Sequence, residues 1–129
     1  MFIEIEPQSA VPIYLQLANQ IMEGVANGQL PPGSPLPSGR AFAADLGMNM
    51  HTVNKAYHYL EEKKMIEIIP KKGVFIHSNA LRKATEEEKQ RIEQELRPIL
   101  AEAICLQLEK EEMEKMIERT IRNIQEGAK

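Results

Sequence analysis

Three short stretches of this sequence carry side chains that could recognise a negatively charged, hydrogen-bonding ligand. The first contains Ser38 and Arg40, the second spans residues 49–55, and the third is Lys71-Lys72-Gly73. Hydroxyl, amide, imidazole, guanidinium and ammonium groups bind phosphates and the edges of nucleic-acid bases through hydrogen bonds and charge. These residue types therefore indicate noncovalent recognition.

Residues suited to covalent or metal chemistry do not form a recognisable pattern. His51, His58 and His77 share no metal-ligand spacing, and no glycine-rich phosphate loop or nucleophile motif is present. Cys105 has no second cysteine to pair with and lies in an apolar helical stretch, where we expect it to be a packing residue. The sequence predicts no catalytic residue, no metal site and no cofactor.

The charge balance restricts how a nucleic acid could be bound. The formal net charge is −3, and residues 1–80 contain six basic and seven acidic side chains. A nucleic-acid-binding domain commonly has a basic excess. The positions of the cations must therefore matter more than their number.

The elements that would position these side chains can be read from the apolar spacing. Residues 12–28 predict an amphipathic helix that ends at a glycine, and the proline-rich residues 31–37 predict a rigid extended connection. Ser38 is a good N-cap for a second helix that stops at Gly47, and Asn49 is a good N-cap for a third.

The buried face of the third helix follows helical spacing: Val53, Ala56, Tyr57 and Leu60. Two helices joined by a short turn at a glycine form a helix-turn-helix. Two β-rich pieces, residues 65–69 and 74–77, then flank a basic turn and predict a hairpin wing. The fold class we expect is mainly α with a small β wing, with residues 1–79 as a winged helix-turn-helix domain.

A recognition helix enters the major groove by its N-terminal residues, and the N-terminus of the preceding helix suits a phosphate. Glycine at a wing tip lets the backbone approach a minor groove while lysine meets phosphate. The residues we expect to contact DNA are Ser38, Arg40, Asn49, Met50, His51, Thr52, Lys55, Lys71, Lys72 and Gly73. Taken alone, the two wing lysines could be solvated turn residues, and Arg40 could form an ion pair with Asp45 or Glu61.

Residues 80–129 have a helical composition with apolar stripes that cannot close a core of their own. We expect two helices, separated near residues 108–110, with Pro98 kinking or restarting the first. Their stripes should pack on each other and on a second copy of the chain, as a two-helix dimerisation tail. The expected interface residues are Ile92, Leu96, Leu100, Ile104, Met113, Ile117, Ile121 and Ile124.

Four motifs, in order and without a gap over about residues 10–77, resemble the DNA-binding domain of the GntR family of bacterial regulators. They are Pro12-Ile13-Tyr14-Leu15-Gln16-Leu17, Gly28-Gln29-Leu30-Pro31-Pro32-Gly33, Leu36-Pro37-Ser38-Gly39-Arg40, and Thr52-Val53-Asn54-Lys55-Ala56-Tyr57 followed by Leu60-Glu61. The short helical tail resembles that of the YtrA subfamily, whose members dimerise through two C-terminal helices.

This resemblance implies a transcriptional repressor that binds a palindromic operator as a homodimer, with targets that include neighbouring transporter operons. It also implies that Arg40 contacts DNA. The sequence departs from the family at Met50, where many relatives carry arginine, and at Lys71, where the wing usually has glycine. A small-molecule effector could bind only at the dimer seam or between tail and winged domain, because the tail is too thin to enclose one.

Two other functions compete with this interpretation. The near-neutral charge would permit a winged helix that binds a protein partner without sequence-specific DNA binding. An enzyme is opposed by the length and the residue inventory. No apolar run reaches a membrane span and no signal-peptide layout is present, so we expect a cytoplasmic protein.

Overall fold

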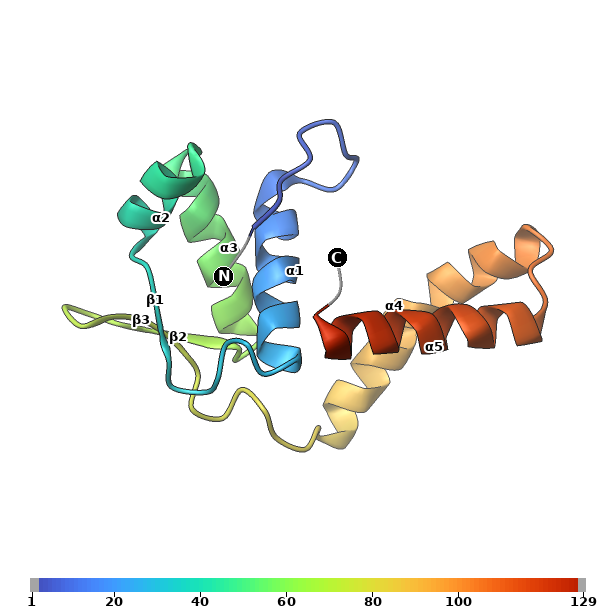
Figure 1. Cartoon of the computed structure of the whole chain (residues 1–129). Helices are drawn as coiled ribbons and strands as arrows, with labels where there is room; N and C mark the ends of the chain where they lie inside the picture. The colour runs from blue at the N-terminus through green and yellow to red at the C-terminus, as the bar shows by residue number, and fades with distance from the viewer. Residues whose placement is uncertain (1–2, 128–129) are drawn as a thin grey trace. The chain divides into compact units, whose positions relative to one another are not determined.

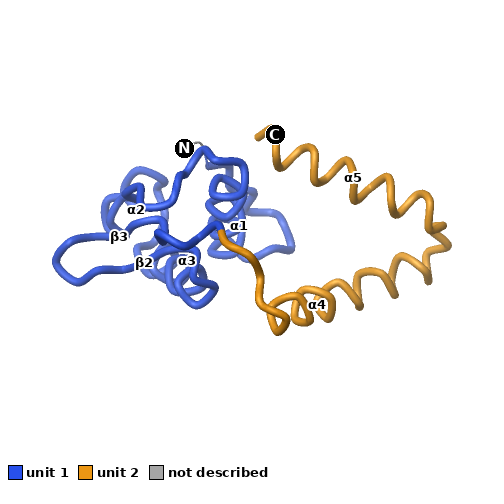
Figure 2. Tube along the Cα trace, turned by 90° about the horizontal axis from the view of Figure 1, so that it is seen from below, with its two compact units in different colours: residues 1–81 blue, residues 82–129 orange. Residues whose placement is uncertain are grey.

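The computed structural model describes residues 3–127, which fold into two compact units divided between Leu81 and Arg82 (Figure 2). The first, here called the winged unit, contains α1 (Ile13–Ala26), β1 (Pro35–Leu36), α2 (Gly39–Leu46), α3 (Met50–Glu62), β2 (Ile66–Ile69) and β3 (Gly73–Ile76). The second, here called the tail, contains α4 (Glu86–Cys105) and α5 (Lys110–Glu126). The chain is therefore mainly helical with one small sheet, as predicted.

One hydrophobic core lies within the winged unit, where α1 and α2 both pack against α3 (Figure 1). Leu17, Ile21 and Val25 are buried because their spacing of four places them on one face of α1. The predicted face of α3 is also buried, and Leu36, Val74 and Ile76 extend the core to the sheet. Burying these side chains positions the three helices relative to one another.

The sheet is antiparallel with strand order β1-β3-β2. Ile66 pairs with Ile76 and Ile69 with Gly73, which gives the predicted hairpin (Figure 1). The expectation for residues 31–37 was an extended connection, and the strand β1 within it was not predicted. A strand with proline is tolerated there because β1 pairs on one side only, with β3.

Two glutamines of α1 hold residues 3–6 against the helix. Each carboxamide bonds to both the backbone N–H and the C=O of one residue, as a neighbouring β-strand does. The Gln20 carboxamide accepts from Glu4 N at 2.9 Å and donates to Glu4 O at 2.5 Å. Gln16, one helical turn earlier, accepts from Glu6 N at 2.8 Å and donates to Glu6 O at 3.0 Å. Ile3 and Ile5 pack against the core as a result.

The tail consists of two amphipathic helices joined by residues 106–109. Thr85 caps α4 through a capping box, in which its hydroxyl accepts from Glu88 N and the Glu88 carboxylate accepts from Thr85 N. Among the described residues of the two helices none is buried. The expectation that their stripes also pack on each other is therefore not met within one chain.

Pro98 neither ends nor restarts the first tail helix, because α4 is continuous from Glu86 to Cys105. Of the two predicted outcomes at Pro98, a kink or a restart, the restart does not occur. Proline removes the hydrogen bond that would reach the carbonyl of Gln94, four residues earlier. Both residues are exposed, so water can bond to that carbonyl and the helix continues.

Candidate nucleic-acid interface

The connection between α2 and α3 has the geometry of a helix-turn-helix. Gly47 ends α2 with φ of 64°, a left-handed conformation that favours glycine, and Met48 N then donates to Ala43 O at 3.0 Å. Asn49 caps α3 by accepting from His51 N at 2.7 Å. Three residues thus redirect the chain from one helix into the next.

The start of α2 offers backbone donors next to a free cation. The Ser38 hydroxyl accepts from Ala41 N at 3.1 Å, which leaves the N–H groups of Gly39 and Arg40 without an acceptor inside the helix. Arg40 is exposed and forms no ion pair or side-chain hydrogen bond among the described residues, so neither Asp45 nor Glu61 engages it. This end of α2 suits an anion such as phosphate.

A buried tyrosine fixes α3 against the start of α2. The Tyr57 hydroxyl donates to Pro37 O at 2.6 Å, immediately before the Ser38 cap, and its ring stacks on Phe42. Burial raises the pKa of Tyr57 well above its ordinary value, which keeps the phenol protonated as a donor. The relation between the two helices is therefore set by a directed bond as well as by packing.

The front of α3 presents fewer free polar groups than its sequence suggests. His51 is exposed, whereas Thr52 is half-buried and Met50 is half-buried against the core. Asn49 is exposed, but its side-chain oxygen already serves as the cap. His51 is thus the exposed polar side chain of this first turn that is not already engaged by the helix cap.

Lys55 is held by an aromatic ring. Its ammonium lies 4.3 Å from the centre of the Tyr14 ring, and Tyr14 meets Tyr59 edge to face at 6.2 Å. Lys63 in turn lies 5.1 Å from the Tyr59 ring. This cation–π ladder joins α1 to α3 and directs the Lys55 charge toward the α1 side of the helix.

The hairpin tip projects from the sheet (Figure 1). Lys71 and Lys72 at this tip are exposed. Lys71 adopts φ of 67°, a conformation that favours glycine, and Gly73 adopts φ of 131°. Lys71 is therefore an L-residue held in a left-handed conformation that glycine adopts more easily. The turn closes through a bond from Lys72 N to Ile69 O of 3.0 Å.

Asn54 is a polar residue of α3 that was not among the predicted contacts. It is half-buried, and a side-chain carbon on Gly39 would collide with its Oδ1 atom. The sequence did contain a signal, because glycine is a poor choice at the start of a helix unless space is short.

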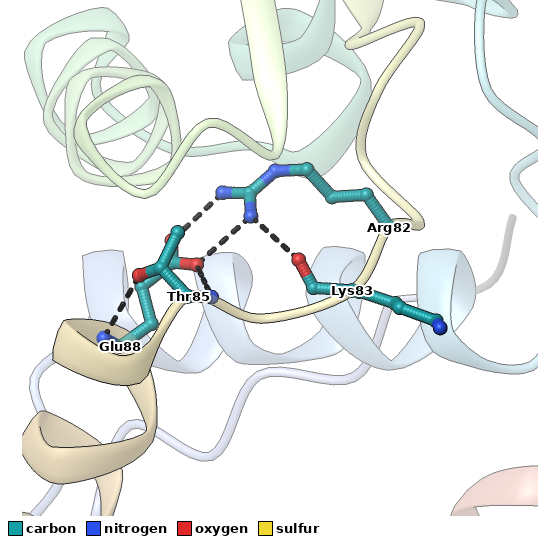
Figure 3. A network of polar contacts seen from close by, with 4 residues as sticks. All are labelled: Arg82, Lys83, Thr85 and Glu88. Atoms are coloured by element: carbon teal, nitrogen blue, oxygen red, sulfur yellow. Dashed lines mark hydrogen bonds and ion pairs between the residues drawn. The ribbon is translucent and has the colours of Figure 1, made fainter.

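A separate polar cluster surrounds the first turn of the tail (Figure 3). Arg82 donates to both carboxylate oxygens of Glu88, at 2.8 and 2.7 Å, and to Lys83 O at 3.2 Å. The hydrogen bond from Arg82, followed by that from Thr85 N, lowers the pKa of Glu88 to about 2. The same pairing raises the pKa of Arg82. This cluster defines where α4 begins.

The predicted dimer residues form exposed apolar stripes along the tail helices. Ile92, Leu96, Leu100 and Ile104 of α4 are exposed, as are Ile117 and Ile121 of α5. Met113 and Ile124 are half-buried. Leu106, at 66% exposure, continues the apolar surface between the helices.

Within residues 3–127, no group of three histidine, cysteine or acidic side chains is placed to hold a metal ion. None of the helices in the same range has the length and apolar character needed to cross a membrane.

Three packed helices followed by a β-hairpin, with a tight turn before the third helix, define a winged helix-turn-helix protein. Residues 13–76 match the model of bacterial regulatory proteins of the gntR family. The chain is also 32% identical to the HTH-type transcriptional repressor YtrA of Bacillus subtilis, over 98% of both proteins. It belongs to the GntR family and is a DNA-binding transcriptional regulator.

Two solved structures extend the similarity through the tail. A transcriptional antiterminator from Listeria monocytogenes EGD-e is 29% identical with a TM-score of 0.90, over 97% of this chain and 93% of that one. YtrA from Sulfolobus acidocaldarius, a GntR-family transcription factor, is 36% identical with a TM-score of 0.55, over 94% and 97% respectively. The winged unit and the helical tail thus occur together in relatives of nearly the same length.

Proposed function

We propose that this regulator is a repressor that binds a palindromic operator as a homodimer. Residues 1–79 are the DNA-binding domain and residues 80–129 are the dimerisation segment. The protein acts in the cytoplasm, has no enzymatic activity and controls a transporter operon. A small-molecule effector would act by changing the angle between the two DNA-binding units of the dimer.

The observation that carries the proposal is the free Arg40 at the open end of α2, next to the front of α3. Its guanidinium can reach phosphate or guanine while the N–H groups of α2 bind the DNA backbone. Ser38 and Asn49 shape the two helix ends, and His51, Thr52 and Met50 meet base edges. Lys55, Lys71, Lys72 and Gly73 supply backbone contacts on either side.

The homodimer is supported by the exposed stripes of the tail. Ile92, Leu96, Leu100 and Ile104 on α4, with Met113, Ile117, Ile121 and Ile124 on α5, offer an apolar surface that one chain leaves uncovered. A second copy would cover it and place two recognition helices about one helical turn of DNA apart, ~34–36 Å.

Selection of bound sequences from random duplexes tests the proposal. We expect the protein to enrich a palindrome, Arg40→Ala to weaken binding to every duplex, and His51→Ala to relax preference at one base pair per half-site. Selection by both variants of the same sequences with unchanged affinity would show that the reading face is elsewhere.

Salt dependence separates DNA binding from the alternative of a protein-interaction module. Binding through several phosphates must weaken steeply between 50 and 200 mM salt, by about 10³-fold or more when six or more phosphates are contacted. Affinity for the selected duplex that stays constant over this range would favour the alternative.

The dimer is tested by Ile117→Glu, which places a charge in the apolar stripe of α5. We expect a monomer in sedimentation and a large loss of operator affinity, because one DNA-binding unit loses its linkage to the other half-site. Lys115→Glu on the exposed polar side of the same helix is the control and should remain dimeric. A monomeric Ile117→Glu that keeps full affinity would contradict the dimer.

A further inference from the structure

Tyr57 of α3 is an aromatic residue that brings a polar group into the core. Only 1% of the residue is exposed, and its ring stacks on Phe42 of α2 with 6.3 Å between the ring centres. A phenylalanine could fill the same space without removing a hydroxyl from water. The hydroxyl therefore needs an acceptor, which is Pro37 O at 2.6 Å. Because a carbonyl carries no proton, the hydroxyl is the donor of this bond.

The Pro37 carbonyl belongs to the peptide unit that joins β1 to the cap of α2. Leu36, just before Pro37, pairs with Val74 of β3. Ser38, just after it, is the N-cap of α2. Since a peptide unit is planar, a bond to Pro37 O also restricts the orientation of Ser38 N. The start of α2 is thus held by the sheet on one side and by α3, through the Tyr57 hydroxyl, on the other.

This bond links the two parts of the proposed DNA-binding face. The first is the start of α2, where Arg40 is exposed and the N–H groups of Gly39 and Arg40 have no acceptor inside the helix. The second is the front of α3, which begins at Met50, about two helical turns before Tyr57. Phosphate contacts set the register and orientation of a protein on a duplex. A change in the direction of α2 would therefore also change how α3 enters the groove.

We propose that Tyr57 is a positioning residue for DNA binding. Its hydroxyl holds the start of α2 in the orientation in which Arg40 and the free N–H groups meet phosphate while α3 lies in the major groove. Tyr57 is buried and acts through Pro37 rather than by touching DNA. The proposal rests on the proposed function, which places α2 and α3 against a duplex.

Tyr57→Phe tests the proposal, because it keeps the ring on Phe42 and removes only the hydroxyl. We expect affinity for the selected operator to fall about two- to tenfold, the fold-change equivalent of one net hydrogen bond. The slope of log affinity against log salt should become shallower by up to about 0.9, the contribution of one phosphate. In the free protein, the amide NMR resonances of Gly39 and Arg40 should shift.

Ile21→Val is the matched control for a purely structural effect. Ile21 of α1 is fully buried, and the loss of one methylene from a core lowers stability by about as much as the loss of one hydrogen bond. Thermal denaturation shows whether the two variants are equally destabilised and folded at the assay temperature. Ile21→Val should keep the operator affinity, the salt slope and the Gly39 and Arg40 resonances of the parent.

A double-mutant cycle with Arg40→Ala tests whether the hydroxyl acts through the start of α2. In the Arg40→Ala background, Tyr57→Phe should weaken binding less than it does in the parent, because one of the groups that it positions is gone. Fully additive losses would show that the two residues act independently and would contradict the proposal.

Two further outcomes would overturn the role of Tyr57. One is a Tyr57→Phe protein with the affinity and salt slope of the parent, and the other is an equal loss of affinity in Ile21→Val. If the parent enriches a palindrome and Arg40→Ala weakens binding while Tyr57→Phe behaves as the parent, only the role of Tyr57 is wrong. If the parent enriches no sequence, the proposed DNA-binding face itself is wrong.

Discussion

Leu60 and Leu96 are the same residue type on two helices of one chain, and their surroundings are opposite. Leu60 of α3 has none of its surface exposed, whereas Leu96 of α4 exposes 42%. The whole winged unit follows the first pattern, with helices and sheet around one core, and the tail follows the second, with no buried residue among those described. One unit is stabilised within its own chain, and the other leaves its apolar side chains uncovered.

This difference shows what each unit requires in order to be stable. The tail helices have 20 and 17 residues, and in proteins most of the stability of a helix comes from packing of its apolar face rather than from intrinsic propensity. Apolar patches that remain uncovered on a monomer mark interaction surfaces. The tail should therefore gain its stability from association, while the winged unit should not depend on it.

The largest expected effect comes from matched leucine truncations in the two units. Leu60→Ala should lower the free energy of unfolding by about 2–5 kcal/mol at every protein concentration, because it leaves a cavity in the core. Leu96→Ala should act only through association, with a loss that grows as protein concentration rises. Urea denaturation at several concentrations measures both.

Equal and concentration-independent losses in these two variants would contradict the comparison. They would mean that the tail is covered within its own chain. Denaturation monitored separately by winged-unit and tail probes would locate the covered surface.

A smaller effect, confined to the winged unit, comes from the glutamines of α1 that hydrogen-bond to the backbone of Glu4 and Glu6. Gln20→Ala removes the two hydrogen bonds to Glu4, and at a net ~0.5–1.5 kcal/mol each we expect a loss of about 1–3 kcal/mol in the free energy of unfolding. Asn19→Ala, at the exposed neighbouring position of α1, is the control and should change stability little. Hydrogen exchange of the Glu4 amide should accelerate in Gln20→Ala and not in Asn19→Ala. An amide that stays protected in Gln20→Ala would contradict its hydrogen bond to the Gln20 side chain.

Local rules were sufficient for much of the winged unit. Ser38 and Asn49 are the caps that their side chains predict, and Val53, Ala56, Tyr57 and Leu60 are buried as their spacing predicts. Caps and periodicity depend on residues within one or two turns, so they can be read from a single sequence. The hairpin followed in the same way from the turn at residues 70–73.

Contacts between distant segments could not be predicted by these rules. Three contacts join residues from separate elements: β1 pairs with β3, the Asn54 side chain lies against Gly39, and the Lys55 ammonium lies over the Tyr14 ring. Each depends on how the packed helices and strands approach one another. The helices that carry the predicted DNA contacts could thus be read from the sequence, while the surroundings of the individual side chains required the structure.

The smallest effect concerns the ion pair at the start of the tail and is visible in a single titration. The pKa of Glu88 is lowered to about 2 from an ordinary 4.5, so its contribution to stability is present above about pH 4.5 and is lost as the pH falls toward 2. Arg82→Gln removes the hydrogen bond that is the largest cause, and the Glu88 midpoint should rise toward 4.5. Carbon NMR of the side-chain carboxyl measures it directly. Lys89→Gln, which breaks the exposed pair with Glu86 instead, should leave the Glu88 midpoint in place. A midpoint that stays near 2 in Arg82→Gln would assign the lowered pKa to the capping box at Thr85, and the first turn of α4 would then be held by its cap alone.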